Sequence, residues 1–170
     1  MSIDKQKAEA SKKNLENADL KNADLQEADL SEGILIEACL ENSNLSEADL
    51  CQADISGANL KNAQLHRTVL YRCRGKEVDF SNAVLTQANL VEANLSGANF
   101  THANLMESNI EGANLTNTCF KDANLSEVNL TGVFLANANL LGADFTNSEC
   151  IAADLAGCDL TGANLHNTYL

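Results

Sequence analysis

The sequence has no proline and no tryptophan, and only 4% of its residues are aromatic. A core built mainly from large aromatic side chains is therefore excluded. Apolar residues still make up 45% of the chain, which is too many for an acidic disordered chain. With 170 residues, the chain is long enough to form one domain with a buried core. That core must be assembled from smaller aliphatic side chains.

Basic residues are also scarce. Eleven Lys and Arg residues against 24 Asp and Glu residues give a formal net charge of −13. Because phosphate would be repelled, no direct binding of nucleic acid is expected, whereas basic protein surfaces are favoured as partners. No segment is apolar enough to span a membrane, and the first residues, MSIDKQKAEASKK, lack the apolar stretch of a signal peptide. We therefore expect a cytoplasmic protein that does not bind membranes.

The chain is dominated by a five-residue unit, as in NADLKNADLQEADL at 17–30. Every fifth residue from Leu15 to Leu170 is Leu, Ile or Phe, except Gly75 and Cys150. From Leu20 on, a small residue or Val precedes each of these positions by two, from Ala18 to Thr168, and mostly Asp or Asn lies between, so the unit is A-(D/N)-L-x-x. Residues five apart differ by about 140° around an α-helix, and an odd spacing alternates faces along a strand. A short extended segment followed by a turn explains the period, because the chain then coils around its own leucines and alanines.

The residues expected in the turns agree with this scheme. Seven of the nine glycines lie two positions after the central Leu, and Asn is frequent at the same position. The third residue of a type II turn has positive φ, which suits Gly and Asn. Glu residues at other copies, such as Glu47 and Glu107, predict a mixture of turn types.

The tandem unit resembles the pentapeptide-repeat proteins over essentially the whole chain after residue 13, and its near-pure form is similar to the cyanobacterial members. The resemblance implies an all-β fold, a right-handed quadrilateral parallel β-helix (a solenoid) with about 20 residues per coil. Residues 14–170 would then form about eight coils. The resemblance also implies that the central Leu and the Ala two positions before it point inward. Residues 1–13 are expected to form an N-terminal tail or capping helix.

The spacing of opposite charges supports four sides. At a spacing of 20, five of the seven basic residues after Lys13 have an acidic neighbour; at 15 none has one, and at 25 three do. Such neighbours would be the cross-strand pairs of a sheet. The predicted pairs are Lys21 and Lys61 with Glu41, Arg67 with Glu47, Arg72 with Glu92, and Arg74 with Asp54. The same spacing places Phe80, Phe100 and Phe120 in one inward column, which predicts a stack of rings.

No pattern typical of a catalytic or metal site is present. No two of the six cysteines are 20 apart, so six free thiols and a reducing compartment are expected. The three histidines form no ligand cluster, and RGKE at 74–77 lacks the upstream Gly and the following Ser or Thr of a phosphate-binding loop. The Asp residues recur with the repeat on flat walls. We therefore expect no enzymatic activity, no cofactor and no metal.

The repeat is broken once, in VLYRCRGKEVDF at 69–80, where Gly75 replaces the central Leu. Residues 56–76 hold five basic and no acidic residues, whereas 14–55 hold one basic and 11 acidic residues. One interpretation is a repaired repeat, in which Cys73 and Val78 partly fill the gap. The other is a partner-docking site, because Tyr and Arg are common at interface hot spots. Its candidate residues are Arg67, Val69, Tyr71, Arg72, Arg74 and Val91.

These features predict a non-catalytic protein-binding or scaffold module whose protein partner is unknown. The alternative is a DNA mimic, since the resemblance includes proteins that bind DNA gyrase. A net charge of −13 is low beside the about 22 charges of B-DNA over a similar length. The chain also lacks the projecting loops and C-terminal helix of the gyrase-binding relatives.

The last repeat unit ends at Leu170, and nothing in the sequence covers the final coil. Open sheet edges pair with other chains unless they are blunted. We therefore expect a homodimer joined through the C-terminal coil, because a two-fold contact closes on itself. The residues expected at this contact are Leu160, Leu165, Tyr169 and Leu170.

Overall fold

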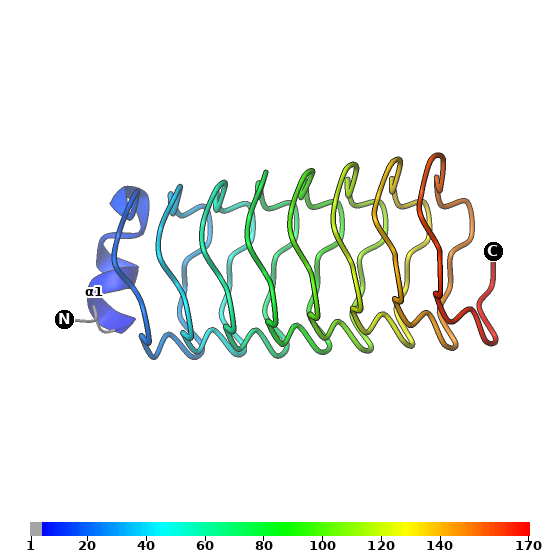
Figure 1. The fold of residues 1–170 in the computed structure, drawn as a ribbon. Coiled ribbons are helices and arrows are strands. Elements are labelled where there is room, and N and C mark those ends of the chain that lie inside the picture. The colour runs from blue at the N-terminus through cyan, green and yellow to red at the C-terminus, as the bar shows by residue number, and fades with distance from the viewer. Residues whose placement is uncertain (1–4) are drawn as a thin grey trace.

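The computed structural model describes residues 5–170 as a narrow rod made of one repeated coil (Figure 1). The helix α1 (Lys5–Ala10) and the short 3-10 helix η1 (Lys12–Asn14) lie at one end. The rest of the chain alternates single-residue parallel bridges with two-residue turns. Each bridge joins residues 20 apart, from Asp19–Cys39 to Glu149–Tyr169. Four five-residue units therefore make one coil, and the predicted four-sided parallel solenoid is confirmed over a three-sided one.

The core is a column of central residues that fills the inside of the rod. From Leu20 to Phe145 the central side chains, Gly75 aside, are at most 1% exposed. The residue two positions before each of them is also buried, as in Ala48 and Ala98, except for Ala18, which is half-buried. Small side chains are needed there because four walls surround a narrow interior that the larger side chains already occupy. The inward assignment of both positions is thus confirmed.

One part of the core is aromatic. The rings of Phe80, Phe100 and Phe120 stack in one column, with centroids 4.9 Å and 4.6 Å apart and interplanar angles of 11° and 2°. The predicted stack is confirmed. Its spacing follows from the backbone, because neighbouring strands lie about 4.8 Å apart and hold the rings at that distance.

The corners of the rod all have the same backbone conformation. Every residue two positions after a central residue, from Asn17 to Asn167, has φ between 51° and 72°. The predicted mixture of turn types is therefore wrong, since Glu47 and Glu107 have φ of 61° and 60°. Closing a four-sided coil demands the same bend at each corner, and this demand outweighs the cost of about 1–2 kcal/mol that a side chain meets in this conformation.

Asp and Asn are preferred on the walls because they support the next corner. The Oδ1 of Asp19 accepts a hydrogen bond of 3.2 Å from the backbone N–H of Lys21, and Asn59 does the same for Lys61 at 3.0 Å. The side chain thereby satisfies an amide at the start of the turn. The A-(D/N)-L spacing combines this support with two buried positions.

The gap expected at Gly75 is closed by its neighbours. A β-carbon on Gly75 would lie 2.7 Å from Leu95 Cδ2, 3.1 Å from Ile55 Cγ1 and 3.2 Å from Val78 Cγ2. Filling by Val78 is confirmed. The leucine of the next coil and the isoleucine of the previous one also occupy the space, and Cys73 is not among these nearest contacts.

We expect Gly75→Leu to lower the free energy of unfolding, although it restores the repeat. The added side chain would enter space that Leu95 and Ile55 already occupy, and such overpacking costs about 1–3 kcal/mol. Urea denaturation followed by circular dichroism measures the change. Gly75→Ala should have a smaller effect, because only one of its contacts is shorter than 3.0 Å and that contact is with a methyl group at the end of the Leu95 side chain. A more stable Gly75→Leu variant would mean that the site is empty.

The N-terminal end of the rod is covered by α1 and η1 (Figure 1). Ala8 is fully buried against the first coil. Two amides at this edge have partners: the N–H of Asp29 donates to Glu9 Oε1 at 2.9 Å, and the N–H of Ile34 donates to the carbonyl of Lys12 at 2.7 Å. Residues 1–4 of the expected 1–13 segment lie outside the described residues.

The same end holds a carboxyl group with a strongly lowered pKa. Lys12 Nζ lies 2.7 Å from Asp29 Oδ1, which also accepts hydrogen bonds from the hydroxyl and the amide of Ser31. These contacts, the one to Lys12 first, lower the pKa of Asp29 from 3.8 to about 2. A lowered pKa means that the contribution of these contacts to stability is present above pH 3.8 and is lost as the pH falls through about 2.

We expect the Lys12→Met variant to raise the pKa of Asp29 toward 3.8, because the largest contact that stabilises the carboxylate is removed. Part of the shift should remain, since both bonds from Ser31 are kept. The measurement is an NMR titration of the side-chain carboxyl carbon, with Lys13→Met as the matched control. An unchanged Asp29 pKa in Lys12→Met would contradict the assignment.

Helices long and apolar enough to cross a membrane are absent from residues 5–170.

Candidate docking surface

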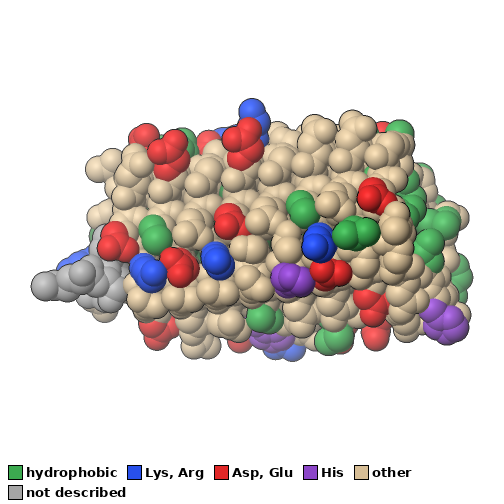
Figure 2. Space-filling view, viewed as in Figure 1, with side chains coloured by type: hydrophobic (Ala, Val, Ile, Leu, Met, Phe, Trp, Pro, Cys, Tyr) green, Lys and Arg blue, Asp and Glu red, His purple; other side chains and the backbone are tan. Residues whose placement is uncertain are grey.

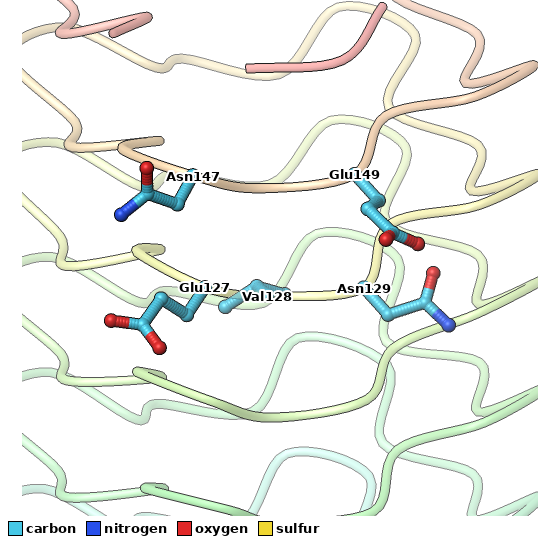
Figure 3. Close-up of a pocket in the computed structure, with 5 residues that line it drawn as sticks. All are labelled: Glu127, Val128, Asn129, Asn147 and Glu149. Atoms are coloured by element: carbon cyan, nitrogen blue, oxygen red, sulfur yellow. The ribbon is translucent and has the colours of Figure 1, made fainter. Parts of the chain in front are cut away.

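A shallow hollow of about 500 Å³ lies on the corner of the rod that contains Glu127 (Figure 3). At the same corner the hydroxyl of Ser148 donates to the carbonyl of Leu125 at 2.5 Å. The N–H of Val128 donates to this hydroxyl at 3.3 Å instead of closing its own turn. The hollow is lined by Glu127, Val128, Asn129, Asn147 and Glu149.

The two carboxylates of this hollow lie at its opposite ends. In Figure 3, Glu127 and Asn147 point outward on one side, and Glu149 points toward Asn129 on the other. Carboxylates placed in this way do not converge on one ligand atom. No group of three or more His, Cys, Asp or Glu residues within 5–170 is arranged to hold a metal ion. The hollow therefore offers polar contacts to a surface ligand, without a centre for chemistry.

Two of the four predicted charge pairs of the basic segment are present. Arg72 Nε lies 2.6 Å from Glu92 Oε2, and Arg74 Nε lies 3.0 Å from Asp54 Oδ2. Lys76 adds a pair with the adjacent Glu77 at 3.4 Å. These guanidinium and ammonium groups are partly neutralised within the chain, which supports the repaired-repeat interpretation for this part of the segment.

Two predicted pairs are wrong. Arg67 donates to Gln87 Oε1 at 2.8 Å rather than to Glu47, and Gln87 in turn donates to Glu107 at 2.7 Å. In the described part of the chain Lys61 forms no ion pair, because Glu41 is bound by Lys21 at 2.9 Å. Each side chain in a column has one neighbour before it and one after it, and the sequence spacing does not choose between them.

The apolar residues of the candidate docking site are partly covered. Val69, Tyr71 and Val91 are half-buried, and the guanidinium carbon of Arg72 lies 4.9 Å from the centre of the Tyr71 ring. Arg67 and Tyr71 belong to the turns at opposite edges of the wall 68–70, and Arg74 lies on the next wall. The structure thus places Tyr71, Arg72 and Val91 together, since the N–H of Arg72 donates to the carbonyl of Val91 at 3.0 Å, whereas Arg67, Val69 and Arg74 lie along the adjoining walls and corner. Docking at these residues stays a prediction.

The most exposed large apolar side chains lie elsewhere, and three of them, Ile34, Phe134 and Ile151, are not among the residues predicted from the sequence. Phe134 and Ile151 are each 52% exposed. Phe134 occupies a wall position that carries Asp or Asn in most units, so the repeat itself marks it as unusual. At the C-terminal coil, Leu165 and Leu170 are 40% and 73% exposed and Tyr169 is 64% exposed, whereas Leu160 is half-buried. A dimer through these four residues stays a prediction.

All six cysteines are free, as predicted. Burial raises the pKa of the Cys73 thiol to about 12 and that of Cys150 to about 11. Neither thiol forms a reactive thiolate near neutral pH. Both are small core residues at inward positions.

The comparisons with known proteins agree with this architecture. A family model, Pentapeptide repeats, matches in eight copies at residues 6–35, 34–70, 79–117, 123–162 and 148–170. A search of curated proteins finds no match. The chain is similar to the crystal structure of HetL, a pentapeptide-repeat protein involved in heterocyst differentiation regulation from the cyanobacterium Nostoc sp. strain PCC 7120. The identity is 27% over 100% of this chain and 95% of that chain, with a TM-score of 0.40.

It is also similar to Rfr23 from the cyanobacterium Cyanothece 51142, with 34% identity over 56% of this chain and 63% of that chain, and a TM-score of 0.43. For QnrB1, a plasmid-mediated fluoroquinolone resistance protein, the identity is 24% over 84% of this chain and 78% of that chain, with a TM-score of 0.46. The family model alone covers most of the sequence, and proteins of this type form right-handed β-helical rods. The chain belongs to the pentapeptide-repeat family.

Proposed function

We propose that the protein is a protein-binding or scaffold module without catalytic activity. The observation that carries this proposal is the fixed register of its walls. Bridges join every coil to the next at intervals of 20 residues, and the column of central side chains beneath them is buried. Outward side chains are therefore held at regular positions on a rod that loses little conformational entropy when it binds, which favours affinity.

The surface supports protein binding better than small-molecule binding. Ligand sites are usually concave and enclose most of the ligand, whereas the hollow at Glu127 is shallow and open on its outer side (Figure 3). Exposed aromatic and aliphatic side chains such as Phe134 and Ile151 are typical anchors of protein interfaces. The net charge of −13 favours a basic partner and opposes nucleic acid and acidic membranes. We therefore propose a basic protein as the partner, and we place both proteins in the cytoplasm.

The test is wall-by-wall photocrosslinking of the full chain in an extract of the source cells. A benzophenone amino acid replaces one outward wall residue at a time on the four walls of one coil, at Asn94, Asn99, Asn104 and Asn109. A binding module should give a discrete crosslinked protein from one wall or two adjacent walls, while the opposite wall serves as the control. Equal, diffuse labelling from all four positions would contradict the proposal.

A DNA mimic is the second candidate, and one observation favours it. One corner of the rod presents an acidic column that contains Glu27, Glu47, Glu107 and Glu127. The same column is interrupted by Arg67, which is exposed. An assay of DNA supercoiling by purified gyrase separates the candidates, because a mimic inhibits or protects the enzyme at near-stoichiometric concentration, whereas a module for another partner has no effect.

A further inference from the structure

A small apolar patch lies on one corner of the rod close to its last coil. We define the Phe134 patch as Phe134, Ile151 and Ala152. Phe134 and Ile151 are each 52% exposed, and Ala152 is exposed as well. Phe134 is bridged to coils on both sides, at Asn114 and Asp154, so its exposure comes from its outward position on the wall. Figure 2 shows apolar side chains gathered at this end of the molecule.

Gly132 leaves the backbone beside Ile151 uncovered. Its N–H donates to the carbonyl of Ile151 at 2.9 Å, which places Ile151 directly beside it on the next coil. Phe134 follows Gly132 by two residues and is the middle residue of the adjoining wall, 133–135. A β-carbon on Gly132 would have no atom within 4 Å. The backbone at Gly132 is therefore uncovered, so an apolar side chain of a partner can lie against it and against the exposed side chains of Ile151 and Phe134.

The residues of this patch depart from the repeat in ways that do not favour folding. In the same wall column, Asn94 and Asn114 accept hydrogen bonds from backbone amides two residues later, at 3.4 Å and 3.2 Å. Phe134 has no side-chain oxygen to do this. Ala152 has φ of 56°, whereas the other described corner residues are Gly or carry polar side chains. A methyl side chain is strained in this conformation and forms no local hydrogen bond in return.

The charges around the patch are all negative. Asp154 follows Phe134 in the same wall column, and Glu149 lies two residues before Ile151. Glu111 lies two coils before Ile151 in its corner column. Residues 123–170 contain no Lys or Arg. A second copy of the chain would bring the same carboxylates against these, which opposes self-association, whereas Lys or Arg side chains of a partner would be attracted.

We propose that the Phe134 patch is the docking site for a basic amphipathic helix of another protein. Its apolar side chains would pack on Phe134 and Ile151 over the uncovered backbone of Gly132, and its Lys or Arg side chains would face Asp154 and Glu149. This inference rests on the proposed function as a protein-binding module, but it selects a surface separate from the basic segment at 61–76. Helices that dock in this way present apolar anchors three and four residues apart.

The test uses fluorescence polarisation with a synthetic labelled helix of Leu and Lys, in which the leucines form one face. A peptide of the same composition in scrambled order carries the same charge without that face. The variants are Phe134→Asn combined with Ile151→Thr, which restore the residues found one coil earlier at each position. The matched control is Ile34→Asn, because Ile34 occupies the same wall column and is 36% exposed.

The double variant is expected to weaken binding of the amphipathic peptide by about tenfold or more, since exposed aromatic anchors commonly contribute this much. Ile34→Asn should leave the affinity unchanged, and the scrambled peptide should bind all proteins equally weakly. Thermal unfolding of each variant confirms that the fold is kept. Equal affinity of wild type and double variant, or equal binding of the two peptides by the wild type, would overturn the proposal. A discrete crosslinked partner from another wall would then leave the broader binding function standing.

Discussion

Replacing Leu95 with Asn is expected to lower the free energy of unfolding by about 3–5 kcal/mol, one of the two largest effects we expect from a single substitution in this protein. Leu95 has no exposed surface, and its Cδ2 lies in the space beside Gly75. The variant therefore loses the buried apolar surface of the leucine and leaves the space beside Gly75 less well filled. It also places an amide among Ile55, Val78 and other apolar side chains, where no partner exists for its hydrogen-bonding groups.

The matched control is Ser96→Asn, one residue along the chain. Ser96 lies at the corner and is not part of the core, so its replacement should change stability by no more than about 0.5 kcal/mol. Urea denaturation followed by circular dichroism gives both values from the same transition. Equal midpoints for the two variants would mean that the inward and outward positions have been assigned wrongly. Both variants introduce Asn into the same segment of the chain, so a difference between them cannot come from the presence of an added Asn alone.

The fold was predictable because the repeat supplies the same evidence many times. A single A-(D/N)-L-x-x unit is compatible with several structures, but an uninterrupted period of five from Leu15 to Leu170 leaves only a coil that turns at every unit. The number of sides was predicted from the spacing of opposite charges. Arg72 and Arg74 have acidic residues 20 positions away, and the structure pairs them with those residues. The stack of Phe80, Phe100 and Phe120 follows from the same spacing.

Side-chain pairing, turn conformation and the packing around Gly75 were less predictable, because each depends on residues of adjacent coils. Arg67 has Glu47 before it and Gln87 after it, and only the side-chain geometry selects Gln87. Glu47 suggested a different turn type, because residue preference was considered without the closure that every corner must satisfy. The space at Gly75 was judged from the two nearest small residues, whereas Leu95 of the next coil fills much of it.

The candidate docking surface shows a different limit. Tyr71 and the arginines were predicted to form a docking site because Tyr and Arg are frequent at interface hot spots. In the structure, Tyr71 is half-buried beneath Arg72. Phe134 lies within the run Val133–Leu135, which has the pattern of a core segment when position in the unit is ignored. Its wall position points outward, and it is 52% exposed. For a repeat protein, an apolar residue is informative when it occupies a position that is polar in the other units.

The second large effect concerns the aromatic stack. Phe100→Ala is expected to lower the free energy of unfolding by about 3–5 kcal/mol, because it removes a buried ring and leaves a cavity. The ring of Phe100 is the middle one, with centroids of Phe80 and Phe120 at 4.9 Å and 4.6 Å. Its loss therefore breaks both ring contacts, and contacts between aromatic pairs contribute about 0.5–1.5 kcal/mol beyond the area that they bury.

Phe145→Ala is the matched comparison, since Phe145 is also a central residue and is only 1% exposed. It has no stacked ring, and the next side chain in its column, Leu165, is 40% exposed. Relaxation of the last coil can partly close the cavity there, which reduces the cost of the substitution. Phe100→Leu should fall between wild type and Phe100→Ala, because Leu60 and Leu140 occupy the same column. Calorimetric unfolding of the three variants should therefore rank Phe100→Ala as the least stable, and a Phe145→Ala variant that loses as much stability would contradict a contribution from the stack.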